Sequence, residues 1–230
     1  MRKFKFQNEY CYHIYNRGVD KRNIFIGDKD YIRFIRSMRE FNTTKVIDSL
    51  YRLDYLRKKE KINSKDSKCP IGHLESNKDN EFCNKLVDIV CYCLNPNHSH
   101  FLLKQLSENG ISIFLHKLNM GYTKYFNYKY NRSGSLFEGT YKLIHINKDS
   151  YLIYLSGYIN GNPEIHKICK AENWLWSSYK DYLGLRQGTL SNKNIILKDF
   201  KNITNYKNYT NIVIKESRQR KDEIKKYLLE

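Results

Sequence analysis

Two histidines, His98 and His100, lie two positions apart in an apolar segment that is predicted to be a strand. Because successive side chains of a strand point to opposite faces of a sheet, both imidazoles leave the same face. Two neighbouring imidazoles can hold a divalent metal ion when a third side chain supplies another ligand. The alternative is a pair of plain surface histidines, although the apolar residues on both sides argue against it.

A tyrosine and an asparagine four residues apart, Tyr158 and Asn162, form a second candidate pair. Residues at this spacing neighbour each other on one face of a helix. An amide oxygen is an acceptable ligand for a hard cation. A tyrosine beside a metal that also holds a phosphate could act as a nucleophile, and its phenol, with a pKa of about 10, needs such help to ionise. Periodicity alone also fits a purely structural Tyr158 in the core.

The overall charge indicates a polyanionic partner. The 230 residues include 41 Lys and Arg against 24 Asp and Glu, which gives a net charge of +17 and a pI near 9.5. Such an excess points to nucleic acid or an anionic membrane surface, although a biased genome can also produce it. No apolar run approaches the roughly 18 residues of a spanning helix, and no apolar signal core is visible, so we expect a cytoplasmic protein.

Cysteine usage adds little chemistry. In a cytosolic protein the six cysteines are expected to be thiols rather than disulfides. Cys69, His73 and Cys83 have a spacing that suggests a zinc knuckle, but no second close pair completes it.

The patterning of apolar residues predicts the elements that position these side chains. Alternation predicts strands at 10–17, 86–94, 98–104 and 141–146, and Asn95-Pro96-Asn97 is typical of a turn. Helical spacing predicts helices at 28–41, 46–62, 107–130 and 149–159. The strands and the helices beside them give a ferredoxin-like β-α-β-β-α-β core of the α+β class, an antiparallel sheet with helices on one face. In the helix at 107–130 the candidate core positions include Ile113, His116, Leu118, Tyr122, Tyr125 and Phe126.

We expect one domain at residues 1–183, with a polar insertion or loop at 57–84. Residues 184–230 are rich in Asn and Lys and end in a charged helix, so they are predicted to be a basic C-terminal extension.

Several short motifs occur in a fixed order along the chain. They are Tyr12-His13-Ile14-Tyr15-Asn16-Arg17-Gly18, Tyr92 to Leu103, Gly134-Ser135-Leu136-Phe137-Glu138-Gly139, Tyr158-Ile159, Asn162-Pro163 and Trp176-Ser177-Ser178-Tyr179. With these motifs, which span about residues 10–184, the chain resembles the single-tyrosine HUH transposases (IS200-like), in particular the REP-associated tyrosine transposase branch.

The resemblance implies a site and a reaction. His98, His100 and Asn162 would hold Mg²⁺ or Mn²⁺, and Tyr158 would be the nucleophile, with Tyr151 and Tyr154 as rivals outside the motif position. The implied substrate is single-stranded DNA with a hairpin, REP-like or from an element end. It would be nicked and rejoined through a 5′-phosphotyrosine intermediate without ATP, by a monomer or homodimer.

Three basic residues that flank the motifs, Arg17, Arg132 and Lys142, are candidates for contacts to the DNA backbone. Each is also consistent with a solvated surface charge. Two other functions stay open. One is a non-catalytic, domesticated nucleic-acid-binding protein on the same fold. The other is a hydrolytic nuclease that uses the histidines without Tyr158.

Overall fold

Four strands form one antiparallel sheet at the centre of the molecule. The structure is a computed structural model, and it describes residues 5–45, 47, 49–66 and 85–227. The strands are β1 (Cys11–Arg17), β2 (Val87–Asn95), β3 (His98–Gln105) and β4 (Lys142–Ile146), in the order β2-β3-β1-β4. Every neighbouring pair is antiparallel. The predicted α+β class with an antiparallel sheet is confirmed, and each predicted strand agrees to within one residue at either end.

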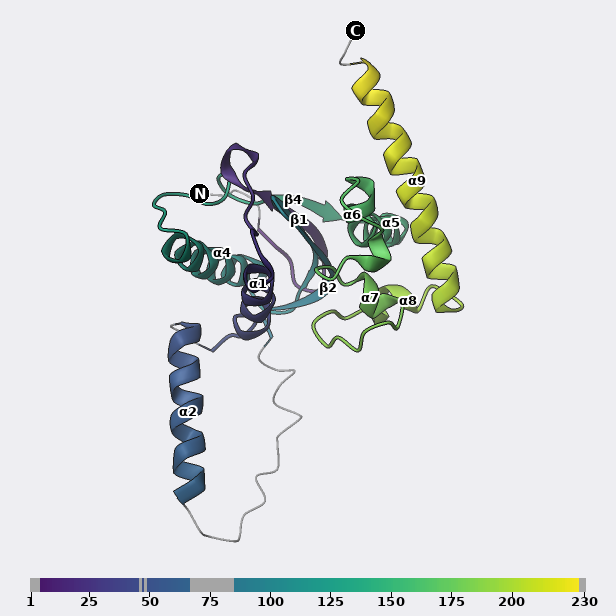
Figure 1. Cartoon of the computed structure of the whole chain (residues 1–230). Helices are drawn as coiled ribbons and strands as arrows, with labels where there is room; N and C mark the ends of the chain where they lie inside the picture. Colours follow the sequence, from purple (N-terminus) through teal and green to yellow (C-terminus); the bar gives the residue numbers. More distant parts are fainter. Residues whose placement is uncertain (1–4, 46, 48, 67–84, 228–230) are drawn as a thin grey trace.

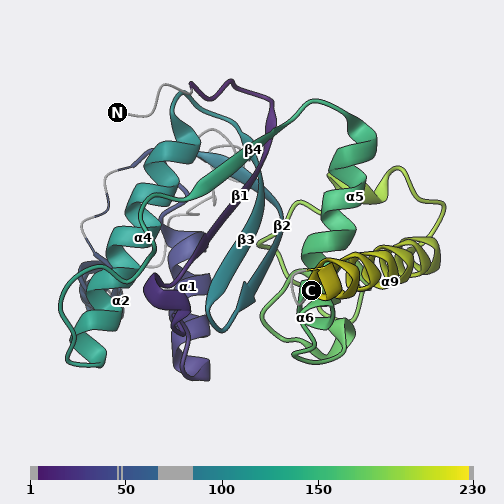
Figure 2. The same ribbon diagram turned by 90° about the horizontal axis from the view of Figure 1, so that it is seen from above.

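Helices α1 (Asp28–Glu40) and α4 (Gly110–Lys129) lie on one face of this sheet, as predicted (Figure 2). Alternation along the strands supplies the apolar side chains that they cover, because every second residue points to the same face. Tyr12 and Ile14 of β1, with Phe101 and Leu103 of β3, are buried against the two helices in one core. The intervening residues of both strands therefore face the other way.

The buried stripe of α4 differs in part from the prediction. Leu118, Tyr122 and Phe126 are buried as predicted, whereas Ile113 is 40% exposed and His116 lies on the surface. The stripe begins with residues at positions i, i+3, i+4 and i+7, namely Ile111, Phe114, Leu115 and Leu118. Since apolar residues occupy both faces at the start of this helix, spacing alone does not decide which face is buried.

The opposite face of the sheet is covered by elements that follow β4, which a fold with helices on one face does not include. They are α5 (Asp149–Asn160), α6 (Asn162–Ile165) and α9 (Ile203–Tyr227), and α9 packs beside α5 (Figures 1 and 2). Leu102 of β3 is buried there with Ile159 of α5 and Ile214 of α9. A Cβ atom at Gly161 would lie 2.5 Å from the Ile214 side chain, so glycine permits this close approach. The residues predicted to be an extension thus pack into a second core.

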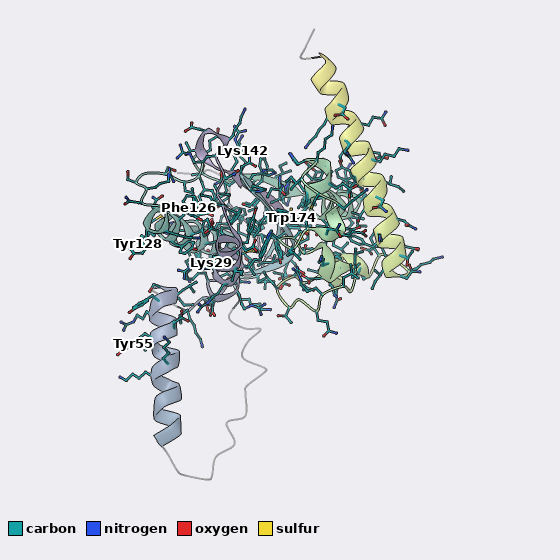
Figure 3. The ribbon with its side chains drawn as sticks, in the orientation of Figure 1. Lys29, Tyr55, Phe126, Tyr128, Lys142 and Trp174 are labelled. Atoms are coloured by element: carbon teal, nitrogen blue, oxygen red, sulfur yellow. The ribbon has the colours of Figure 1, made fainter. Side chains whose placement is uncertain are left out.

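Short elements connect the sheet to the C-terminal helix. η2 (Ala171–Asn173), α7 (Tyr179–Tyr182) and α8 (Asn194–Leu197) lie between α6 and α9 along the chain. Trp174 lies between the sheet and these elements, and its indole Nε1 donates to the Leu94 carbonyl oxygen at 3.1 Å (Figure 3). This segment therefore fastens the C-terminal elements to the end of β2, close to the turn that precedes His98.

A buried carboxylate, Asp30, joins α1 to α4. It accepts hydrogen bonds from the backbone N–H groups of Ile26 and Gly27 and from the side chains of Tyr125, Lys129 and Tyr130. Burial by itself would raise the pKa of Asp30. The hydrogen bonds to the charged form outweigh it, so the pKa lies below the usual value.

Helix α2 (Leu50–Asp66) projects from the body of the molecule (Figure 1). It begins and ends four residues later than predicted, so the first part of the predicted insertion at 57–84 is helical. Its side chains Tyr51 and Tyr55 are exposed, and Figure 3 shows Tyr55 on the projecting helix. Arg36 of α1 forms an ion pair with Asp54 of α2. Residues 67–84 lie outside the described residues, and with them Cys69, His73 and Cys83 of the suggested zinc knuckle.

Within residues 5–45, 49–66 and 85–227, no helix combines the length and the apolar character needed to cross a membrane.

Candidate active site

Both predicted metal-ligating histidines lie on the face of the sheet that α5 covers. His98 begins β3 and pairs with Arg17 of β1, and His100 pairs with Tyr15. The preceding turn, Pro96-Asn97, is held from outside, because the Pro96 carbonyl oxygen accepts from the N–H groups of Ile24 and Phe25. Strand alternation places His98 and His100 on one face, with ring centroids 5.1 Å apart and ring planes nearly perpendicular.

Helix α5 and the junction that follows it bring Tyr158 and Asn162 to the same place. The Tyr158 ring lies edge-on to His100, with 6.1 Å between ring centroids. Asn162 is the first residue of α6 and is completely buried. Pro163 comes directly after it, where the missing N–H of proline costs nothing in the first turn of a helix. The four residues proposed from sequence as nucleophile and metal ligands are therefore neighbours in space.

Hydrogen bonds fix the orientation of the His98 ring. Its Nδ1 donates to the Asn97 side-chain oxygen at 2.6 Å, so the lone pair is on Nε2. That Nε2 lies 3.3 Å from the Asn162 Oδ1 atom. The Asn95 amide Nδ2 donates to both of these atoms. Two lone-pair atoms thus converge on one point, and in this structure the donor at that point is the Asn95 amide.

The His100 ring is held by a third histidine, His13 of β1. His13 Nε2 and His100 Nδ1 are 3.0 Å apart in the protein interior. The ring of Tyr15 stacks against His100, at 5.7 Å between centroids and 26° between planes. His13 was part of a motif noted in the sequence, but no feature of its spacing identified it as a site residue.

His98, His100 and Tyr158 line one cavity of about 450 Å³, whereas the buried Asn162 and His13 lie behind its wall. Its wall includes the predicted residues Arg17, His98, His100, Lys142 and Tyr158. It also includes residues that were not predicted, namely Tyr15, Asn16, Lys21, Asn97, Glu138, His166 and Lys221. The wall therefore combines four basic side chains, three imidazoles and the phenol of Tyr158.

The C-terminal helix reaches this cavity through Lys221. Its Nζ donates to His166 Nε2 at 2.9 Å, and the His166 ring lies 4.9 Å from the His98 ring. The charge of Lys221 contributes to the lowered pKa values of His98, His100 and His166. Lys221 is one of 41 basic residues, so sequence offered no signal to single it out.

The three predicted DNA-contacting residues have different positions. Arg17 and Lys142 line the cavity, and Lys142 is an exposed residue at the start of the edge strand β4 (labelled in Figure 3). Arg17 forms an ion pair with Glu138 at the mouth, where both side chains are about half exposed (46% and 45%). Arg132 lies outside the cavity and donates to the Asn127 side chain at 3.2 Å.

Burial governs the protonation of the central groups. It lowers the pKa values of His98 and His100, so both rings are neutral at neutral pH and carry lone pairs for a metal. Burial raises the pKa of Tyr158 above the usual value, and the Asn162 side chain offsets this in part. The Tyr158 hydroxyl therefore keeps its proton at neutral pH in this structure.

The spacing of two of these donor atoms is compatible with a divalent cation. Ligands about 2.1 Å from such an ion in an octahedral arrangement lie about 3 Å from each other, and the His98 and Asn162 atoms are 3.3 Å apart. In the part of the chain that the structure describes, no three His, Cys, Asp or Glu side chains converge as a metal site. The amide oxygen of Asn162 lies 3.3 Å from His98 Nε2, and its role as a third ligand stays a prediction.

Comparison with known proteins agrees with the motifs. The model of the family described as "Transposase IS200 like" matches residues 58–162, which include the β2–β3 hairpin, Tyr158 and Asn162. This match confirms the predicted resemblance to IS200-like transposases. No curated protein matches the chain.

Among solved structures, the chain is similar to "Structure of the REP associates tyrosine transposase bound to a REP hairpin". The TM-score is 0.49 and the identity 12%, over 80% of this chain and 84% of that one.

Proposed function

We propose that this protein is a transposase that nicks and rejoins single-stranded, hairpin-bearing DNA through a 5′-phosphotyrosine intermediate. The observation that carries the proposal is the placement of the Tyr158 phenol beside His100, in one cavity with His98 and next to Asn162. A purely structural tyrosine has no need of that neighbourhood. The match to the IS200-like family supports the same class of reaction.

The reaction needs a nucleophile, a charge beside the phosphate and a means of holding the strand. The Tyr158 oxygen, after loss of its proton, forms a bond to phosphorus as the bond to the 3′ oxygen breaks, and the 3′ oxygen takes up a proton. The phosphodiester energy stays in the phosphotyrosine bond, so a second 3′-hydroxyl can reverse the step without ATP. A divalent cation on His98, His100 and Asn162 would supply the Lewis acid that polarises the phosphate.

Basic side chains around the cavity are suited to hold the DNA backbone. Lys21, Lys142 and Lys221 line it, together with Arg17, which forms an ion pair with Glu138. Lys221 contacts His166, which burial keeps neutral at neutral pH by lowering its pKa to about 4, so the charge of Lys221 stays uncompensated by this partner. We propose that Lys221 contacts a phosphate oxygen beside the scissile bond.

The test is formation of a covalent complex with labelled hairpin DNA and Mg²⁺, detected after denaturation. We expect the wild type to form the adduct and Tyr158→Phe to lose it, while the fold and DNA binding persist. The matched controls are Tyr151→Phe and Tyr154→Phe on the same helix, which should keep the adduct. An adduct that survives in Tyr158→Phe contradicts the assignment. Cleavage without any adduct indicates a hydrolytic nuclease, and binding without cleavage indicates a domesticated binding protein.

A further inference from the structure

His13 is a buried histidine with no place in the reaction described above. Only 5% of it is exposed, and its Nδ1 has no hydrogen-bond partner among the described residues. The only polar contact of its ring in this part of the chain is the one between its Nε2 and His100 Nδ1, at 3.0 Å. Burying a polar ring costs free energy unless its polar atoms are hydrogen-bonded. The one hydrogen bond of the His13 ring ends on a proposed metal ligand.

The direction of this hydrogen bond follows from the chemistry of the ligand. A cation bound at His100 Nε2 uses the lone pair of that atom, so the proton of the neutral ring must be on Nδ1. The acceptor within reach of that proton is His13 Nε2. In the other tautomer His100 carries its proton on Nε2 and presents N–H to the cavity, where it cannot bind a metal.

Resting on the proposed function, we infer that His13 is a positioning residue, which accepts the Nδ1 proton of His100 and so leaves His100 Nε2 free to bind the divalent cation. Asn97 does the same for His98 from the other side, by accepting its Nδ1 proton at 2.6 Å. Each ligand ring thus has its own acceptor, one on β1 and one in the turn. Such partners of metal-bound histidines typically change metal affinity by 10- to 100-fold when removed.

Contacts with neighbouring rings also hold His13 in place. The rings of His13 and His100 are nearly parallel, at 18° with 5.3 Å between centroids, and Tyr15 lies 5.2 Å from His13. A substitution at residue 13 must therefore be chosen to separate the loss of the acceptor from the loss of packing. Phenylalanine keeps a flat ring and removes the acceptor. Glutamine places its amide near the position of the imidazole Nε2, and asparagine is one bond too short to reach it.

The test measures Mn²⁺ binding to the full chain without DNA, by the decrease of the free-ion EPR signal. We expect His13→Phe and His13→Asn to bind Mn²⁺ roughly 10- to 100-fold more weakly than wild type, and His13→Gln to stay within about threefold. Long-range ¹H–¹⁵N spectra of the wild type with Mg²⁺ should show His100 as the Nδ1–H tautomer. DNA binding without metal should be unchanged in all variants that keep the wild-type melting temperature.

Several outcomes would overturn the inference. One is an Nε2–H tautomer of His100 in the presence of Mg²⁺, and another is equal Mn²⁺ affinity in the wild type and His13→Asn. If His13→Phe does not fold, the comparison of the Gln and Asn variants still decides, because both carry an amide and differ in reach. A wild type that binds no Mn²⁺ contradicts the metal-dependent function itself. If the wild type and His13→Asn bind Mn²⁺ with equal affinity, only the role of His13 is contradicted.

Discussion

The Nζ atom of Lys221 lies 2.9 Å from Nε2 of His166, and this contact brings the C-terminal helix to the wall of the cavity that holds Tyr158. The two residues are 55 positions apart in sequence. Their contact depends on the packing of α9 against α5 and α6, since Ile214 of α9 is buried with Ile159 and Ile165. The position of the Lys221 ammonium group at the cavity is therefore set by α9, a helix that comes late in the sequence, well after the last strand.

Replacing Lys221 with methionine should slow adduct formation while leaving the stability of the fold nearly unchanged. Methionine keeps most of the apolar stem but removes the charge, so we expect adduct formation to slow by roughly 10- to 100-fold if one charged contact to the phosphate of about 1.5–3 kcal/mol is lost. The rate of covalent complex formation at saturating DNA measures this effect.

The matched control for this variant is Lys215→Met, on the same helix but outside the wall of the cavity. It should keep the wild-type rate. Equal slowing in both variants would show that general charge, rather than the position of Lys221, is responsible.

Removal of either metal-ligating histidine should abolish divalent-metal-dependent cleavage. His98→Ala and His100→Ala each delete a proposed ligand, while the basic residues proposed to hold the DNA stay in place. We therefore expect loss of adduct in Mg²⁺ and Mn²⁺ and retention of most of the hairpin affinity. His116→Ala, on the surface of α4, is the control and should cleave normally. Wild-type cleavage by the double variant of His98 and His100 would make the site assignment wrong.

DNA binding should depend strongly on salt. The net charge of +17 and the basic wall of the cavity indicate that phosphate contacts dominate the affinity. If about five phosphates of a single strand are neutralised, log K should fall against log salt with a slope of about −3 to −4. Fluorescence anisotropy across a salt series measures this slope, and a slope near zero would contradict nucleic-acid binding.

Asp30 should stabilise the protein at neutral pH and lose this effect in acid. Asp30→Ala removes five hydrogen bonds, so the free energy of unfolding at pH 7 should fall by roughly 3 kcal/mol. Because the pKa of Asp30 is lower in the folded state than in the unfolded chain, the contribution of its charge is complete above about pH 4. It is lost as the pH falls through the folded-state value.

Urea titrations between pH 7 and pH 2 check this expectation. The gap in unfolding free energy between wild type and Asp30→Ala should narrow at acid pH. Asp28→Ala, an exposed residue in the same helical turn, should cost much less at any pH. A gap that stays constant down to pH 2 would show that Asp30 acts through packing rather than through its charge.

The sheet and the hairpin could be predicted because their signals are local. Alternation of apolar residues fixed each strand to within one residue, and the Asn95-Pro96-Asn97 turn placed His98 and His100 on one face. The buried face of α4 could not be fixed, because apolar residues at 111 and at 113–115 fit two helix faces equally well. His166 and Lys221 could not be predicted at all, since only the packing of α9 on α5 and α6 brings them to His98.

His13 is an intermediate case. Its motif was visible in the sequence, and alternation places it on the same face as Tyr15, but its partner on β3 depends on the register of β1 against β3. The second core, on the opposite face of the sheet, could not be predicted for a similar reason. Nothing local in α9 shows that Tyr206 and Ile214 are buried rather than solvent-facing.

The residues that line the cavity come from distant parts of the sequence, from Tyr15 in β1 to Lys221 in α9. A fragment that stops before α9 can carry both histidines, yet it lacks Lys221 and leaves the outer side of α5 uncovered. A chain in which α9 is not packed against α5 has the same defect, because that packing places Lys221 beside His166. On the proposed function, the cavity that would cut DNA is therefore complete only in a chain whose C-terminal helix is folded in place.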